Sequence, residues 1–211
     1  MDMRDAISIV KNPDYWRFAL IMNAPENADT DFTTDGFVES VNKIMNGKIG
    51  NLLQRVITLT KANADILNGK AEVNQIVSDK LGALIKKYNA QFENIELREA
   101  LKTVVEIADL GNSLMSMEEP WVMAKSAKSD KTSAQQFSSI MNALIKICYS
   151  VSILVYPFIP SSSGKALKYF GLKEPTLGDL TKTPRLNLEE NPKPIFERLT
   201  DEQIKKISGY S

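Results

Sequence analysis

The sequence contains no histidine and a single cysteine among its 211 residues. The absence of histidine excludes catalytic triads that use an imidazole base and most zinc-ligand sets, and one cysteine cannot form a disulfide framework. Cys148 lies in the apolar stretch 145–149, which favours a small buried hydrophobe over a reactive thiol. These absences remove many classes of enzyme, and the cysteine usage fits a reducing cytosol.

Excess charge and membrane-length apolar runs are absent as well. Lys+Arg and Asp+Glu both number 26, so net charge predicts no bulk adhesion to nucleic acid or anionic lipid, and any RNA recognition must be local. The N-terminus lacks the apolar region of a secretory signal, and the apolar stretch 147–160 is too short to span a bilayer. We therefore expect a core helix there, no membrane partner and a cytoplasmic protein.

Motifs for nucleotide chemistry are missing too. Neither the Walker phosphate loop nor the Rossmann glycine pattern occurs, and the Gly-Lys-Ile-Gly at 47–50 lies inside a helical stripe. The carboxylate pairs Glu118-Glu119 and Glu189-Glu190 lie in segments that look solvated, which gives little reason to expect the perturbed pKa of an acid–base catalyst. The sequence therefore predicts no catalytic residue, no metal site and no cofactor bound by this chain.

Helical periodicity is what the sequence does contain. Apolar residues repeat every three or four positions in four stretches, which predicts four long amphipathic helices. The first begins at Thr33 or Thr34 and ends near Asn68-Gly69, and the others cover about 73–88, 97–115 and 137–154. Pro120 is expected to stop the third helix. Shorter helices are expected from Pro13, at 163–170 and at 202–207, and strands are expected to be scarce because period-two alternation is lacking.

These helices predict the fold class. Four amphipathic helices joined by short polar connections form an all-α antiparallel bundle, since no single apolar stripe can be buried without the others. From Leu172 onward four prolines and few periodic apolar residues predict an irregular C-terminal arm. We therefore expect a linker segment at 1–32, a helical bundle at 33–171 and the arm at 172–211.

Two polar residues share one face of the first long helix. Asn51 and Arg55 are four positions apart, beside the Leu52/Val56 stripe. Arginine offers a rigid fork of donors and asparagine a donor and an acceptor, which together can read the Watson–Crick edge of an unpaired base. Composition alone favours a plainer interpretation, in which Arg55 is solvated or salt-bridged.

An aromatic residue follows the proline that stops the third helix. Trp121 lies where the chain must turn away, so its ring can remain exposed as a platform on which one stacked base gains about 1–3 kcal/mol. The alternative, favoured without further information, is that Trp121 packs into the bundle as large aromatic residues mostly do. Lys125, Lys128 and Lys131 follow in an expected polar loop, where they can meet phosphates or remain solvated.

Four segments together resemble the C-terminal half of methionyl-tRNA synthetases, in order and at that family's spacing. They are residues 14–20 leading into 25–32, residues 37–55, residues 112–125 and residues 194–199. The most specific is Asn112 followed nine residues later by Trp121, within the run Glu-Pro-Trp-Val-Met-Ala-Lys at 119–125. The resemblance covers about residues 13–199. Within it, residues 70–95 match the family only in their helical pattern.

The resemblance implies the anticodon-binding region of a class I aminoacyl-tRNA synthetase. The resemblance implies that the CAU anticodon of tRNA(Met) is bound by four residues: Asn51, Arg55, Pro120 and Trp121. Trp121 would stack on the first anticodon base, while Asn51 and Arg55 would bond to base edges. The implied partner is therefore the anticodon stem-loop of tRNA(Met).

The resemblance also implies roles for the flanking parts. Lys125 and Lys128 are possible phosphate contacts, and residues 1–32 include a stem-contact segment. The arm is implied to fold back toward the catalytic domain of the same enzyme, so that Ile195 and Phe196 would be exposed without that partner.

Catalysis is implied to lie outside this chain. The family's HIGH and KMSKS motifs, which bind ATP and activate methionine, do not occur in the sequence. ATP and methionine are therefore expected to bind a missing catalytic domain, and this chain alone is not expected to aminoacylate tRNA. Two departures from the family pattern are Leu114, at a usually aromatic position, and Gly111, which is expected to loosen its helix.

Two other interpretations stay open. One is the equivalent bundle of a leucyl, valyl or cysteinyl enzyme, against which the spacing from Asn112 to Trp121 argues. The other is a helical protein-interaction domain without an RNA role, for which the neutral overall charge is the best evidence.

Overall fold

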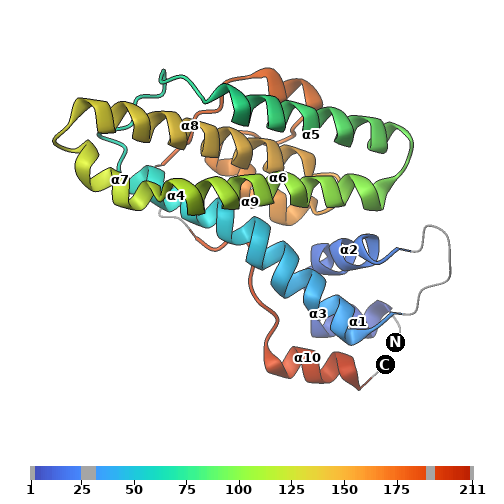
Figure 1. Cartoon of the computed structure of the whole chain (residues 1–211). Coiled ribbons are helices and arrows are strands. Elements are labelled where there is room, and N and C mark those ends of the chain that lie inside the picture. Colours follow the sequence, from blue (N-terminus) through green and yellow to red (C-terminus); the bar gives the residue numbers. More distant parts are fainter. Residues whose placement is uncertain (1–2, 25–31, 189–192, 210–211) are drawn as a thin grey trace.

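The computed structural model describes residues 3–24, 32–188 and 193–209. Every regular element within these ranges is a helix, which confirms the predicted all-α class (Figure 1). The elements are α1 (Met3–Ile9), α2 (Pro13–Met22), α3 (Thr34–Val38), the π-helix η1 (Glu39–Gly50), α4 (Asn51–Ala62), α5 (Gln75–Glu93), α6 (Leu97–Glu118), α7 (Pro120–Ala127), α8 (Lys131–Leu154), α9 (Pro160–Tyr169), the 3-10 helix η2 (Leu177–Thr181) and α10 (Asp201–Ser208).

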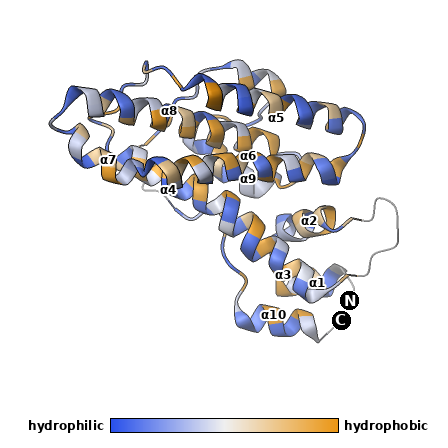
Figure 2. Cartoon of the chain, in the orientation of Figure 1, coloured by the Kyte–Doolittle hydropathy of each residue, from blue (hydrophilic) through white to orange (hydrophobic). Residues whose placement is uncertain are grey.

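Helices α4, α5, α6 and α8 build the bundle. Helix α6 packs against both α5 and α8, α7 packs against α8, and α4 lies against α8 and α6. Figure 2 shows hydrophobic residues concentrated where α6 and α8 lie against each other, and hydrophilic residues along the connecting loops. Burial of the apolar stripes stabilises the fold at about 25 cal/mol per Å² of apolar surface removed from water. Its largest fully buried side chains include Phe37, Met45, Ile49, Leu52, Leu101, Ile107, Met115 and Phe137.

The first long helix is continuous from α3 through η1 to α4. It begins as predicted, because the Thr33 side chain accepts a hydrogen bond from the Gly36 N–H at 3.1 Å. The predicted end near Asn68-Gly69 is wrong, since α4 ends at Ala62. There the buried Asn63 side chain donates to the Leu59 carbonyl at 2.9 Å and so satisfies one of the carbonyls at the helix end.

Pro120 ends one helix and begins another. It stops α6 as predicted, but it also occupies the first position of α7, where its missing N–H costs nothing. The expected polar loop is therefore wrong. Lys125 lies inside α7, Lys128 is the C-cap of that helix and Lys131 begins α8.

Asp14 ties the N-terminal helices to the bundle. Its carboxylate is fully buried and accepts hydrogen bonds from the Ser162 N–H at 2.6 Å and from Arg17 Nη1 at 3.0 Å. Ser162 lies in the first turn of α9, where free N–H groups and the helix dipole favour a negative charge. A buried carboxylate thus caps a helix far away in the sequence.

The C-terminal arm is irregular apart from η2, as predicted, within the described residues 172–188 and 193–199. It does not leave its apolar residues exposed, however. Ile195, Phe196 and Leu199 are buried against the rest of the chain, so the expectation of an exposed Ile195 and Phe196 is wrong. At the end of the arm, α10 lies beside α1, which brings the two ends of the described chain together (Figure 1).

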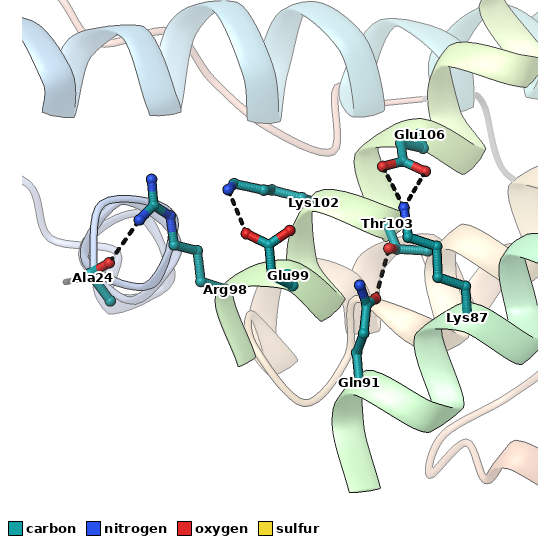
Figure 3. A network of polar contacts seen from close by, with 8 residues as sticks. All are labelled: Ala24, Lys87, Gln91, Arg98, Glu99, Lys102, Thr103 and Glu106. Carbon is teal, nitrogen blue, oxygen red and sulfur yellow. Dashed lines mark hydrogen bonds and ion pairs between the residues drawn. The ribbon is translucent and has the colours of Figure 1, made fainter. Parts of the chain in front are cut away.

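A polar network joins the first half of α6 to its neighbours (Figure 3). Arg98 Nη1 donates to the Ala24 carbonyl at 3.1 Å, which links α6 to the end of α2. Such half-exposed contacts add little stability. The other pairs are Lys87 with both carboxylate oxygens of Glu106, Thr103 with Gln91, and Lys102 with Glu99.

Helix α8 is the apolar core helix that the sequence predicts around residue 150. By length and hydropathy it could cross a membrane, but 78% of its most apolar window is buried inside the bundle. Its Cys148 is fully buried, and burial raises the pKa of the thiol well above its usual range. The prediction of a small buried hydrophobe at this position is confirmed.

Gly111 lies where α4, α6 and α8 meet. A Cβ at this position would come within 2.7 Å of Leu52 Cδ2 and 3.0 Å of Ile147 Cγ2. The expectation that Gly111 loosens α6 is therefore wrong, because it lies inside a continuous helix and lets two neighbouring helices approach its backbone.

We predict that Gly111→Ala lowers the free energy of unfolding by about 1–3 kcal/mol, since the added methyl overpacks the helix contact. The matched control is Gly82→Ala in α5, where a Cβ would have no neighbour within 4 Å. There the gain in helix propensity is expected to stabilise the chain by about 0.5–1 kcal/mol. Urea denaturation measures both, and a stabilising Gly111→Ala would contradict the account.

We also predict that Cys148 does not react with a thiol reagent in the native chain. The thiolate is the reactive form, and burial both hides the sulfur and disfavours ionisation. Absorbance of the reporter released by a disulfide reagent should stay flat until denaturant unfolds the chain. Rapid reaction without denaturant would show that α8 is accessible.

Candidate nucleic-acid interface

Arg55 and Trp121 come together at the surface, although they belong to different helices. The guanidinium carbon of Arg55 lies 5.1 Å from the centre of the Trp121 ring, in the geometry of a cation–π contact. Trp121 is 39% exposed, whereas the other tryptophan, Trp16, is 4% exposed. Full burial of Trp121, the plainer alternative from the sequence, is therefore wrong.

Asn51 lies one turn before Arg55 on the same face of α4. Both side chains are exposed, while Leu52 and Val56 beside them are buried. Among the described residues no carboxylate lies within ion-pair distance of Arg55, so the salt-bridge explanation of this residue does not hold. Asn51, Arg55 and Trp121 thus form one surface, which we call the α4–α7 face.

The last turn of η1, just before α4, is held against α6 by two polar contacts. Lys48 Nζ lies 2.7 Å from the carboxylate of Asp109, and Asn112 Nδ2 donates to the Lys48 carbonyl at 3.2 Å. These contacts fix η1 just before Asn51. Sequence reasoning singled out Asn112 by its spacing but missed Lys48 and Asp109, because nothing in the sequence pairs charges on separate helices.

The corner between α6 and α7 determines where Trp121 lies. Glu119 adopts a left-handed conformation with φ of 42°, which is uncommon for a residue with a side chain and turns the chain sharply. Pro120 follows as a buried residue at the start of α7, and Trp121 comes next on the outside. Met117 and Val122, close to Trp121 in the sequence, are also exposed, at 73% and 50%.

Two lysines follow Trp121 along the same helix. Lys125 lies one turn after Trp121, hence on the same side of α7, and Lys128 caps the end of that helix. Both are exposed. Helix α7 therefore adds two exposed cations to the face that bears Trp121, and the exposed Glu118 and Glu119 precede it in the sequence.

The carboxyl group with the most strongly lowered pKa lies in the arm. Hydrogen bonds from Lys182 and from Thr176 lower the pKa of Asp179 to about 2. Asp179 closes the capping box of η2, so this shift belongs to a local turn. Among the described residues no group of three or more His, Cys, Asp or Glu side chains is arranged to hold a metal ion.

Two protein-family models match the chain. Residues 67–209 match the anticodon-binding domain of methionyl tRNA ligase, and residues 1–57 match the class I tRNA synthetases of the methionine type. Together the two models cover both sides of the α4–α7 face.

Curated relatives agree with these models. A methionine–tRNA ligase of Caldivirga maquilingensis is 32% identical over 196 residues, which cover 90% of this chain and 32% of that protein. The cytoplasmic methionine–tRNA ligase of Caenorhabditis elegans is 31% identical over 207 residues, which cover 93% of this chain and 22% of that protein. This chain therefore spans about a third or less of the length of these relatives.

Solved structures show the same fold. The free methionyl-tRNA synthetase of Mycobacterium tuberculosis matches with a TM-score of 0.78 at 20% identity, over 92% of this chain and 40% of that one. The complex of the same enzyme with methionyl-adenylate matches with a TM-score of 0.75, over 88% of this chain and 37% of that one. Because the family model of the anticodon-binding domain covers well over half of the sequence, this chain belongs to the methionyl-tRNA ligase family.

Proposed function

We propose that this chain recognises the CAU anticodon of tRNA(Met) through the α4–α7 face, as the anticodon-binding part of a methionine–tRNA ligase. The observation that carries the proposal is the exposed Trp121 ring under the Arg55 guanidinium, with Asn51 one turn away. The family of the chain supports this function.

Stacking supplies the affinity in this proposal. An unpaired base stacked on an exposed aromatic ring gains about 1–3 kcal/mol, whereas a cation–π contact at an exposed site contributes about 0.5–1 kcal/mol. The first anticodon base therefore displaces the Arg55 guanidinium from Trp121.

Hydrogen bonds supply the specificity. Every base has a flat face that can stack, so Trp121 alone would accept any of them. The displaced fork of Arg55 and the amide of Asn51 are free to bond to base edges, where the four bases differ in donors and acceptors. Discrimination of CAU therefore depends on these two polar groups.

Pro120 and the lysines have supporting roles. Pro120 is buried, so it acts by starting α7 and directing Trp121 outward. Lys125 and Lys128 lie on the exposed side of α7, where they can contact phosphates next to the stacked base. Phosphate contacts orient the RNA without reading its sequence.

In this proposal, the parts of the relatives that this chain does not match correspond to the rest of the enzyme. Activation of methionine with ATP belongs to a catalytic domain that this chain does not contain, and that domain is the protein partner of residues 1–32 and of the arm. We keep the division at 1–32, 33–171 and 172–211 as a proposal. The nematode relative is named a cytoplasmic enzyme, which supports a cytoplasmic location.

Binding of anticodon stem-loops tests this function. We expect the chain to bind a CAU stem-loop more tightly than a stem-loop whose first anticodon base is changed, when both are measured at the same moderate salt concentration. Trp121→Ala should weaken CAU binding about tenfold or more, because the stacking platform is lost. Arg55→Ala or Asn51→Ala should mainly reduce the preference for CAU.

Trp16→Phe is the matched tryptophan control, because Trp16 belongs to α2, is buried and stacks on Phe37. Its RNA affinity should equal that of the unmodified chain in a fluorescence-anisotropy titration. No binding of any stem-loop would refute the proposal and favour a protein-interaction role for this face.

The lysine contacts predict a change in salt dependence. Each phosphate contact to single-stranded RNA contributes about 0.7 to the slope of log affinity against log salt concentration. Lys125→Ala and Lys128→Ala should each lower that slope by about this amount and weaken all stem-loops alike. Lys80→Ala, on the exposed surface of α5, serves as the control and should leave the slope unchanged.

A further inference from the structure

Helix α4, which carries Asn51 and Arg55, follows directly on the π-helical segment η1. In a π-helix the N–H groups bond to carbonyls five residues back, so the segment changes the direction in which the following side chains point. The N–H of Asn51 still reaches the Asn46 carbonyl. The direction of Asn51 and Arg55 therefore depends on what holds η1 in this form.

The C-terminal arm touches η1 at two places. A Cβ built on Gly50 would come within 2.7 Å of Phe196 Cδ2, so the Phe196 ring lies directly on the last residue of η1. The Leu199 N–H donates to Asn42 Oδ1 at 2.8 Å, near the first turn of the same segment. Phe196 and Leu199 are both buried.

The arm itself is fixed where it makes these contacts. The Tyr15 hydroxyl accepts a hydrogen bond from the Glu197 N–H at 2.7 Å and donates to the Glu197 carbonyl at 3.0 Å. Tyr15 belongs to α2 and is buried. The residue after Phe196 is thus anchored on both its backbone groups, which leaves the ring little freedom to leave Gly50.

Two other helices, α6 and α2, hold the rest of η1. The contacts of Lys48 with Asp109 and Asn112 tie it to α6, and Asn23 Nδ2 donates to Ser40 Oγ at 3.0 Å from the end of α2. Segment η1 is therefore held by α6 and α2 on one hand and by the arm on the other, immediately before the residues of the α4–α7 face.

We propose that Phe196 is a positioning residue of the α4–α7 face. Its ring on Gly50 keeps η1 in the π-helical form and so sets the direction of Arg55, whose guanidinium lies over Trp121 in the free chain and next to the stacked base in the proposed complex. The role in RNA recognition rests on the function proposed above. The Arg55–Trp121 contact exists in the free chain, however, so the positioning effect can be measured without RNA.

Trp121 itself reports on the contact. In a Trp16→Phe background Trp121 is the sole tryptophan of the chain, and acrylamide quenching measures its accessibility. Arg55→Ala should raise the quenching constant, because the guanidinium no longer covers the ring. Phe196→Ala should raise it in the same direction and by a comparable amount.

Two further changes separate positioning from a general loss of packing. Ile195→Ala removes an equally buried side chain from the neighbouring position of the arm, where it lies by Tyr169 of α9, and should leave the quenching unchanged. Gly50→Ala should disturb the contact by pushing the ring away. Combining Gly50→Ala with Phe196→Ala should restore quenching toward the background value, because the new methyl occupies part of the vacated space.

Two results of the quenching experiment would overturn the proposal. Unchanged quenching in Phe196→Ala and Gly50→Ala would show that the arm does not position Arg55. Equal changes in Phe196→Ala and Ile195→Ala would show general loosening of the arm, and would overturn it as well.

Stem-loop binding extends the test to function. Phe196→Ala should lower the ratio of CAU affinity to that of a changed first base about tenfold, as expected when one good base contact is lost. Ile195→Ala should keep the ratio. If the unmodified chain binds no RNA, the proposed function fails and quenching alone decides the role of Phe196. If quenching changes but the ratio does not, the role of Phe196 in RNA recognition is refuted.

Discussion

Helices α4, α6 and α8 meet at Gly111, where the absence of a side chain lets Leu52 and Ile147 lie directly on the backbone of α6. Leu52 is next to Asn51, and α6 leads through Glu119 and Pro120 to Trp121. The separation of α4 from α6 therefore sets the distance between the two halves of the α4–α7 face. A wider helix spacing would move Arg55 away from the Trp121 ring.

A neutral chain can recognise RNA if the recognition is local. Equal numbers of acidic and basic residues remove long-range attraction, and the α4–α7 face instead places Arg55 on an exposed ring, with two exposed lysines along the same helix as Trp121. In the free chain Arg55 covers part of that ring. This contact is weaker than the stacking of a base, so in the proposed complex a base can replace the guanidinium on the ring.

Much of the fold could be predicted from the sequence, because apolar residues repeat with the helical period over long stretches. The start of the first long helix was predicted because Thr33 caps it. Its end was not, because it depends on the side chain of Asn63. Helix α7 was missed since it is short and begins with a proline. In η1 the buried apolar residues Val41, Met45 and Ile49 recur every four positions, a spacing that an α-helical stripe also allows.

The candidate site could be predicted only in part. Asn51 and Arg55 share a face by their spacing, but their approach to Trp121 depends on how α4 and α6 pack. The exposure of Trp121 follows from the left-handed conformation of Glu119, which no local pattern indicates. The close approach at Gly111 and the burial of Phe196 are likewise tertiary effects, since their neighbours lie far away in the sequence.

NMR spectroscopy of the free and RNA-bound chain tests the central claim most directly. The two indole N–H groups give separate signals, and that of Trp16 donates to the Val10 carbonyl at 3.2 Å inside the protein. On titration with a CAU stem-loop, the account predicts large shifts of the Trp121 indole and the Arg55 side-chain signals and none of the Trp16 indole. Binding that leaves the Trp121 and Arg55 signals in place would contradict it, because the RNA would then occupy another surface.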